Sequence, residues 1–399
     1  MEYPIGTVLY ETQALRPPVF LRVSRRGDQV TFFDFTNDGD YSLVVLDTNR
    51  KSRVLSRGWR AVTGTAWSAN DKEIWFGGGR AGTDPALWAV DLSGRERPLV
   101  QIAGWPTLQD LAPDGRLLVT NTDSRIGIRC LAPGATEERD LAWLDASHVW
   151  DMSSDGSAII FVELSSGEGR NSAIYLRRTD GTPAVRLGYG ARPSLSLDGK
   201  WVACVRRDRD SSRLLLLPTG AGEEKLVSTG AIQPESVEWF PDGKRLLLTG
   251  NELSQPPRTY LLDLATQKIS PVTSPGLRAS GISPDGRFAA VISGGRLSLH
   301  SLTGTRDIPV GAVDPNVSII RSSNDGRYIF LQRAQDKRCS AAILRMDVRT
   351  GHQEVWRELK LVDPAALFFG SARLSADGKS YAYSFQRDLA TLYLVKGVK

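Results

Sequence analysis

The sequence holds few side chains of the kinds that catalyse reactions, and they are widely separated. Its three histidines are His148, His300 and His352. A hydrolase triad needs one of them beside an acid and a nucleophilic Ser or Cys, and no G-x-S-x-G motif is present. Only His148, three residues after Asp145, falls where a loop could build a site. We therefore expect no catalytic residues in this chain.

Two stretches resemble ligand-binding motifs without meeting the requirements of those motifs. Residues 77–82 fit G-x-G-x-x-G, but a dinucleotide site needs a helix next, and residues 87–90 have the composition of a strand. Residues 34–40 resemble part of a calcium loop, but Val45 holds the position of the closing Glu. The cysteines are too far apart for a zinc site or a disulfide framework: Cys130, Cys204 and Cys339. We expect no cofactor and no metal.

The composition of the chain argues against a nucleic-acid-binding protein and against a membrane protein. The chain has 399 residues, a formal net charge of +5 and 41% hydrophobic residues, enough for a packed core. Its positive charge is dispersed, whereas a nucleic-acid surface concentrates Lys and Arg on one face. No apolar run approaches the roughly 18 residues of a membrane helix, and the first residues do not read as a signal peptide. We expect no nucleic-acid partner and no membrane segment.

Aspartates recur along the chain in a way that could suggest an array of carboxylates. Most of them are followed by Gly and then by a basic or small residue, as in Ser283-Pro284-Asp285-Gly286-Arg287. Asp-Gly favours a hairpin turn because Gly accepts positive φ and Asp bonds its own backbone. We therefore interpret the aspartates as turn residues. The turn position falls at 26, 70, 114, 155, 198, 242, 285, 325 and 377.

This spacing predicts the architecture. Each period of about 40 to 45 residues contains four short strands, the pattern of one β-propeller blade. We predict an all-β chain that forms one domain over residues 1–399, a single β-propeller of four-stranded antiparallel blades. Nine blades are expected, with eight as the alternative. Residues 7–11 would supply the missing fourth strand of the last blade and close the ring.

The repeat resembles the TolB-type, WD40-like propeller repeat, whose mark is a Ser-Pro-Asp-Gly-Lys/Arg turn before a short apolar strand. Residues 112–116, 240–244 and 283–287 carry the resemblance best. Three further stretches are similar to the propeller region of bacterial receptor-type serine/threonine kinases: residues 3–11, 92–97 and 175–187. The resemblance implies a sensor or interaction module outside the cytoplasm. Without that kinase context, we would place the chain in the cytoplasm.

A candidate binding site follows from this fold. Loops that join consecutive blades gather at one mouth of a propeller channel, and here they carry aromatic and arginine side chains, which are common in recognition surfaces. We expect a monomer that binds a protein or a small polar or anionic ligand there. The candidate residues are Trp59, Arg60, Trp105, Trp143, His148, Tyr189, Arg192 and Arg278.

An enzyme built on the propeller, a glycan lyase or a hydrolase, is the alternative. It would need acidic and histidine side chains that converge at the channel mouth, within about 10 Å of one another for paired carboxylates. The candidates for that role are Asp145, His148, Glu235 and Asp314.

Overall fold

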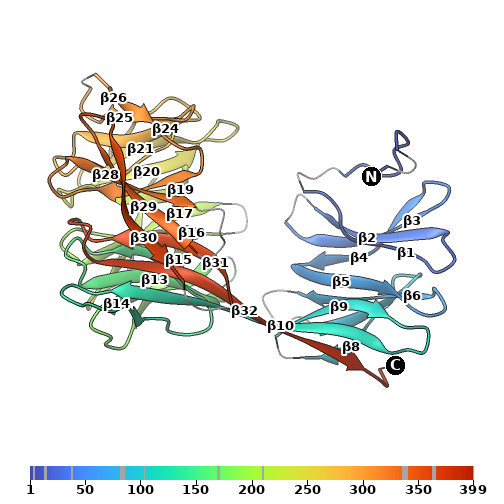
Figure 1. Cartoon of the computed structure of the whole chain (residues 1–399). Coiled ribbons are helices and arrows are strands. Elements are labelled where there is room, and N and C mark those ends of the chain that lie inside the picture. Colours follow the sequence, from blue (N-terminus) through green and yellow to red (C-terminus); the bar gives the residue numbers. More distant parts are fainter. Residues whose placement is uncertain are drawn as a thin grey trace. The chain divides into compact units, whose positions relative to one another are not determined.

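The computed structural model describes residues 1–2, 5–12, 16–36, 39–80, 86–102, 104–168, 171–208, 211–304, 306–334, 340–361 and 365–398. These residues form strands and turns and no helix, so the all-β prediction is confirmed for them. It follows that no helix in this part of the chain could span a membrane. The chain divides into two compact units, residues 1–124 with 388–399 and residues 125–387. We call them unit 1 and unit 2 and describe each by itself (Figure 1).

Unit 1 contains two four-stranded antiparallel sheets and a third, smaller set of strands. The third set pairs β9 (Trp105–Leu111) with the beginning of β10 (Leu117–Leu131). The apolar faces of neighbouring sheets pack together, as where Phe33 and Trp59 meet Phe76. The two full sheets are β1 (Val19–Val23), β2 (Gln29–Phe35), β3 (Tyr41–Asp47) and β4 (Ser52–Trp59), then β5 (Ala61–Trp67), β6 (Glu73–Gly79), β7 (Ala86–Asp91) and β8 (Glu96–Gln101).

Unit 2 repeats the same four-stranded antiparallel arrangement. Its first two sets share the long strand β15, which ends one set and begins the next. These sets are β12 (Ser147–Met152), β13 (Ala158–Glu168), β14 (Asn171–Arg178) and β15 (Val185–Leu195), then β16 (Trp201–Arg207), β17 (Ser212–Pro218) and β18 (Lys225–Val227).

Three further sheets of four strands follow along the chain in unit 2. The first is β19 (Gln233–Trp239), β20 (Arg245–Asn251), β21 (Arg258–Asp263) and β22 (Ile269–Pro271). The second is β23 (Ala279–Ser280), β24 (Phe288–Ser293), β25 (Arg296–Ser301) and β26 (Ile308–Ala312). The third is β27 (Val317–Ser322), β28 (Tyr328–Ala334), β29 (Ser340–Asp347) and β30 (Gln353–Lys360).

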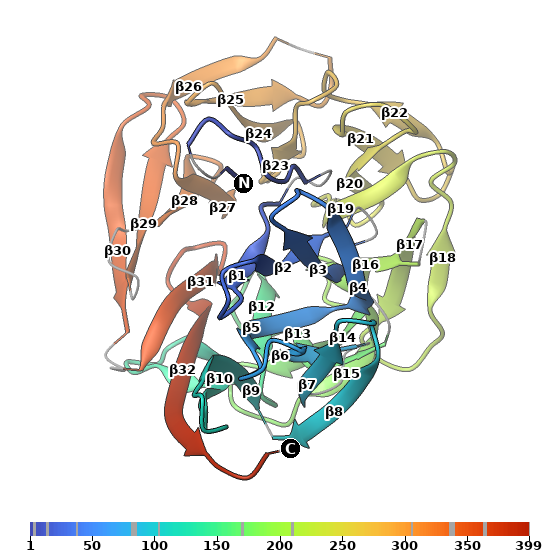
Figure 2. The same ribbon diagram turned by 90° about the vertical axis from the view of Figure 1, so that its right-hand side faces the viewer.

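The last sheet of unit 2 combines strands from distant parts of the chain. Its order is β11 (Arg139–Asp140), β10, β32 (Tyr381–Val395) and β31 (Ala366–Leu374). One face shares a buried apolar cluster with β28 and β29, and the other shares one with β12 to β14. Figure 2 shows the sheets of unit 2 following one another around a common centre. The final sheet of unit 2 is therefore packed between the sheet before it and the first sheet.

This arrangement corrects the predicted ring closure. Residues 7–11 do not add a strand to the last sheet, because β10 and β11 occupy that place. Instead Leu9 and Tyr10 pack against Phe32, and the Tyr10 hydroxyl donates to Asp34 at 2.6 Å. Residues 381–395 form one continuous strand, β32. A single nine-bladed ring is not confirmed. The chain divides into two compact units, and the single domain over residues 1–399 stays a prediction.

The repeated turns form the hairpins predicted from the sequence. At the turn from β23 to β24, Gly286 has φ of 67° and donates its N–H to the Ser283 carbonyl at 2.8 Å. Asp285 accepts hydrogen bonds from the Ser283 hydroxyl and the Arg287 N–H, at 2.6 and 3.0 Å. These bonds lie within five residues, which is why the turn can be recognised locally. The same turn joins the first two strands in each set of both units.

The described part of the glycine-rich stretch, residues 77–80, does not form a phosphate loop. Gly77, Gly78 and Gly79 lie inside β6, and the next described element is the strand β7. A Cβ on Gly77 would approach the Pro106 carbonyl oxygen to 2.4 Å, so the glycine permits close packing of two strands. Ala81, Gly82 and the centre of the calcium-like loop, Asn37 and Asp38, lie outside the described residues, as does Cys339.

Candidate functional site

One register position in the first strand of each set faces a common cavity in unit 2. This position lies four residues before the turn Asp, so that Asp151 precedes Asp155 and Arg321 precedes Asp325. Successive strand residues alternate between faces, which gives this position the same orientation in every set. In chain order the position is held by Asp151, Ser194, Glu238, Gly281, Arg321 and Arg373.

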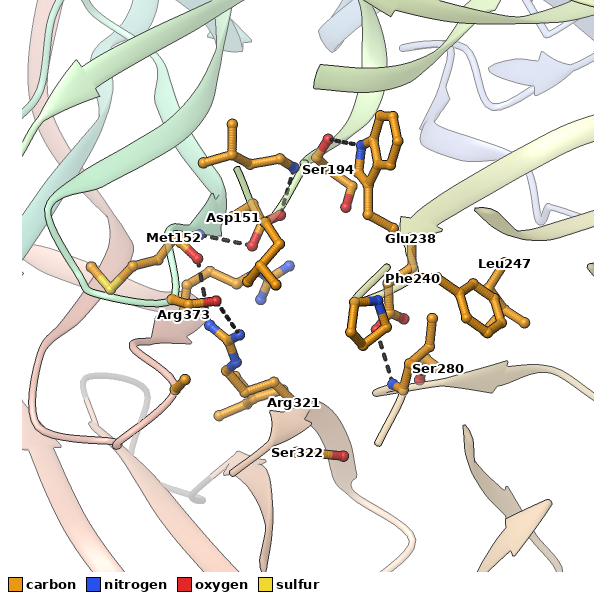
Figure 3. Close-up of a pocket in the computed structure, with 18 of the residues that line it drawn as sticks. Asp151, Met152, Ser194, Glu238, Phe240, Leu247, Ser280, Arg321, Ser322 and Arg373 are labelled. Atoms are coloured by element: carbon orange, nitrogen blue, oxygen red, sulfur yellow. Dashed lines mark hydrogen bonds between the residues drawn. The ribbon is translucent and has the colours of Figure 1, made fainter. Parts of the chain in front are cut away.

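The cavity has a volume of about 370 Å³, within the range of pockets that hold small molecules. Its wall comes from the first strands of the sets, β12, β15, β19, β23, β27 and β31, and from the turns that follow them. Figure 3 shows Asp151, Arg321 and Arg373 grouped together, with Glu238 across the opening in this view. Its charged lining residues are Asp151, Glu238, Arg192, Arg321 and Arg373.

Both carboxylates are held by backbone N–H groups. Asp151 accepts from Met152 and from Leu195 in the next first strand, each at 2.8 Å. Glu238 accepts from Gly281 and Ile282, each at 3.0 Å. Each carboxylate therefore links its own strand to that of the neighbouring set. Two hydrogen bonds to backbone also fix the orientation of each group, which leaves neither free to move during a proton transfer.

The two buried arginines form the corresponding links to carbonyl groups. Arg321 donates to the Leu374 carbonyl at 3.0 Å and to the Ser154 hydroxyl at 3.2 Å. Arg373 donates through Nε to the Trp150 carbonyl. Within the described part of the chain, the Nε atom of Arg321 is buried without a hydrogen-bond partner. The guanidinium of Arg321 thus remains an incompletely satisfied donor on the cavity wall.

Burial shifts the protonation equilibria of these groups. Desolvation raises the pKa of Glu238, although the N–H groups of Ile282 and Gly281 act in the opposite direction. Desolvation also lowers the pKa of Arg321 and of Arg373, while Asp151 and Glu238 oppose that shift. Arginine stays charged in proteins at neutral pH. The cavity therefore presents fixed positive charge, and its negative charge decreases when Glu238 takes up a proton.

The repeated turns border this cavity. We expected the side formed by blade-joining loops, but Ser154, Leu197, Pro241, Pro284 and Asn324 are turn residues that line the cavity. Three neighbouring turns are also bonded to one another. Asn324 donates its N–H to the Ala376 carbonyl at 2.9 Å, and Ala376 donates to the Ser154 carbonyl at 2.8 Å.

The candidate residues of unit 1 do not form one site. Trp59 is fully buried, donates to the Ser56 hydroxyl at 2.6 Å, and is therefore a core residue rather than a contact for a ligand. Arg60 pairs with Asp40 at 3.1 Å. Trp105 begins β9 and is 44% exposed.

The candidates of unit 2 are also dispersed, and Arg192 is the one that lines the cavity. The exposed Arg278 pairs with Glu235 at 2.6 Å. Trp143 is covered on one ring face by Arg177, at 5.4 Å. The Tyr189 hydroxyl accepts a hydrogen bond from Arg186 at 3.2 Å. Arg278, Trp143 and Tyr189 are therefore each in contact with a neighbouring side chain outside the cavity lining.

The enzyme candidates are not brought together at the cavity. Asp145, His148, Glu235 and Asp314 are all missing from its lining. Burial lowers the pKa of His148, and its buried Nδ1 has no hydrogen-bond partner among the described residues. Asp314 accepts from the N–H of Asn316 at 2.7 Å, as a turn residue does. No group of three or more His, Cys, Asp or Glu in the described residues is arranged to hold a metal ion.

Sequence reasoning missed four charged residues of the cavity: Asp151, Glu238, Arg321 and Arg373. The available signal was a charged residue at a constant distance before the turn Asp, in strands that are otherwise apolar or small. Charged side chains are seldom placed inside unless they are paired or hydrogen-bonded. A charged residue that recurs four positions before the turn Asp could therefore have been recognised as a candidate site residue.

No family model matches the sequence, and no curated protein matches it. Solved structures with a similar fold include TolB from Acinetobacter baumannii, 12% identical with a TM-score of 0.42 over 89% of this chain and 78% of that one. A prolyl endopeptidase is 14% identical with a TM-score of 0.38, and this chain spans 54% of its length. Oligogalacturonate lyase in complex with manganese is 15% identical with a TM-score of 0.37, over 78% of this chain and 84% of that one. Similarities at this level do not indicate a function. The resemblance of this chain to the propeller region of bacterial receptor-type kinases stays a prediction.

Proposed function

We propose that this chain is a non-catalytic binding module whose ligand enters the cavity of unit 2. The observation that carries the proposal is how the charged wall is bonded. Asp151 and Glu238 each accept two backbone N–H groups, so they serve as fixed links between strands. A general acid or base must instead reach the proton it transfers in a substrate. The arrangement favours recognition over reaction.

We further propose that the module is the sensor region of a membrane-bound bacterial serine/threonine kinase and lies outside the cytoplasm. The support is the resemblance of residues 3–11, 92–97 and 175–187 to such propeller regions. The experiment is to read the gene around the coding sequence. A kinase domain and a membrane helix encoded upstream in the same reading frame would support this role, and an unrelated upstream gene would contradict it.

The binding role is tested on the whole chain by thermal shift with a broad panel of small polar molecules and short peptides. We expect at least one class to raise the melting temperature in a saturable manner, because a ligand that binds only the folded state stabilises it. The expected effect is lost when Ser280→Trp fills part of the cavity. If no member of the panel binds, or if Ser280→Trp folds and leaves binding intact, the cavity is not the binding site.

The blade count belongs to the same proposal. We propose that unit 2 is a closed ring of six blades and that unit 1 supplies three more. The support is that each neighbouring pair of sheets in unit 2 shares a buried apolar cluster, including the last with the first. An experimental structure with another sheet order would contradict it.

A further inference from the structure

We propose that the cavity of unit 2 is an oxyanion site, in which Arg192, Arg321 and Arg373 bind a carboxylate or phosphate group of the ligand. This inference rests on the proposed binding function and names its ligand class. Three arginines and two carboxylates line the cavity, so its fixed charge is positive. The excess of positive charge selects an anionic ligand.

The hydrogen bonds of the wall point to the same ligand. All four oxygens of Asp151 and Glu238 accept a backbone N–H. The bonds of Arg321 and Arg373 go to carbonyl groups and a serine hydroxyl, not to a carboxylate. Each carboxylate oxygen of the wall thus already accepts one N–H, and neither Arg321 nor Arg373 forms a hydrogen bond to a carboxylate among the described residues, although Asp151 and Glu238 lie near enough to act on their charge. A planar guanidinium fork binds carboxylate or phosphate oxygens through two parallel bonds, which suits these unfilled donors.

Arg321 provides the most specific indication. Its Nε is buried and has no hydrogen-bond partner among the described residues. An unsatisfied buried donor costs free energy, on the order of 1 to 3 kcal/mol, and calls for an explanation. Because this Nε has almost no accessible surface, an oxyanion could accept its N–H only after a small shift of the side chain, but one bound in the cavity would neutralise a charge that desolvation otherwise disfavours.

Arg192 adds a second, independent indication at the cavity wall. It is exposed, and within the described chain no hydrogen bond or ion pair engages its guanidinium. Its φ is 50°, in the left-handed region that non-glycine residues seldom adopt. Such strain concentrates at binding sites, where the surrounding structure maintains it. Arg192 thus lies at the cavity wall although its guanidinium forms no hydrogen bond or ion pair with a described residue.

The test is isothermal titration calorimetry on the whole chain at low salt, with three probes of similar size. Succinate is the dianion, succinamide is its neutral analogue, and 1,4-diaminobutane carries the opposite charge; inorganic phosphate then distinguishes phosphate from carboxylate. We expect succinate or phosphate to bind at one site. Succinamide and diaminobutane should bind at least about tenfold more weakly, the loss of one charge-assisted hydrogen bond.

Two substitutions locate the binding. Arg192→Asn keeps a residue that tolerates positive φ and removes no internal hydrogen bond, so it should weaken anion binding about tenfold without unfolding the chain. Arg213→Asn is the matched control, because Arg213 is exposed, pairs with Asp208 at 2.8 Å and does not line the cavity, so its loss should leave the affinity unchanged. Arg321→Lys retains the charge and removes Nε, and we expect an intermediate loss.

Each outcome decides the inference. Equal weakening by Arg192→Asn and Arg213→Asn would assign the effect to long-range charge and overturn the site. Tighter binding of succinamide or diaminobutane than of succinate or phosphate would overturn the anion class while the binding function stands. No binding of either anion overturns the inference, whereas the binding function fails only if the broad ligand panel also fails.

Discussion

Val149 donates its backbone N–H to the hydroxyl oxygen of Ser384 at a distance of 2.8 Å. The two residues are 235 positions apart, and both are buried. Val149 lies in β12, the first strand of the first set in unit 2, and Ser384 lies in β32 of the last. This single hydrogen bond joins the two sets that are most distant in sequence. It is one of the contacts by which the last sheet packs against the first.

Ser384→Ala should therefore destabilise unit 2. The substitution leaves the buried N–H of Val149 without an acceptor, which costs about 1 to 3 kcal/mol. The measurement is the free energy of unfolding in urea, followed by circular dichroism. Ser228→Ala is the control, because Ser228 is exposed, and it should change the stability by less than about 0.5 kcal/mol. Equal values for the two variants would show that the bond does not stabilise the packing of the last sheet of unit 2 against the first.

Asp151→Ala should destabilise the same unit by removing a link between two first strands. It leaves the N–H groups of Met152 and Leu195 without their acceptor, at an expected cost of about 1 to 3 kcal/mol. Ser194→Ala tests the same register position in the next set, where the side chain forms no hydrogen bond to a described residue. Urea unfolding of both variants measures the two stability losses, and the loss should be larger for Asp151→Ala. A loss for Ser194→Ala as large as that for Asp151→Ala would contradict the role of the carboxylate.

Falling pH should weaken the turns through their aspartates. Hydrogen bonds from Ser153 and from the N–H of Ser157 lower the pKa of Asp155 below its ordinary value of 3.8. A group whose pKa is lower in the folded state contributes stability above its unfolded pKa, and this contribution is lost as the pH falls through the folded value. Asp155 should thus stabilise the fold at pH 7 and cease to do so in strong acid.

The variant Asp155→Asn tests this pH dependence. Its unfolding free energy should lie below that of the unsubstituted protein at pH 7, and the difference should shrink as the pH falls below about 4. Melting temperatures between pH 7 and pH 2 provide the measurement. A difference that stays constant over this range would mean that the charge of Asp155 contributes nothing.

Gly64→Ala should be far more damaging than the same change at a turn. Gly64 has φ of 62°, and a Cβ there would lie 2.0 Å from the Leu108 carbonyl oxygen. We expect a cost of about 3 kcal/mol or more, from backbone strain together with the clash. Gly115→Ala is the control within unit 1, since its φ of 84° is similar but nothing lies within 4 Å. Its cost should be about 1 kcal/mol.

Thermal unfolding of these two glycine variants separates the effects. Similar losses for both would show that β5 and β9 can move apart to admit the methyl group. A much larger loss for Gly64→Ala would confirm that close approach of the two strands requires glycine there.

The sequence by itself determined the repeated unit. The turn at Asp285 depends on hydrogen bonds among Ser283, Asp285 and Arg287, which are close neighbours in the chain. The alternation of apolar residues marks strands for the same local reason. Nine turns could therefore be located, and each joins the first two strands of its set.

Only the tertiary structure decided how the sets are grouped. β10 and β32 are long strands whose beginnings and ends belong to different units. A strand edge can pair with any strand of suitable length, so local sequence did not show that β10 would take the place expected for residues 7–11. The cavity, too, is formed by tertiary packing that the local sequence does not show. Register places Asp151, Arg321 and Arg373 on equivalent faces, but their meeting at one wall depends on packing between sheets whose strands are far apart in the chain.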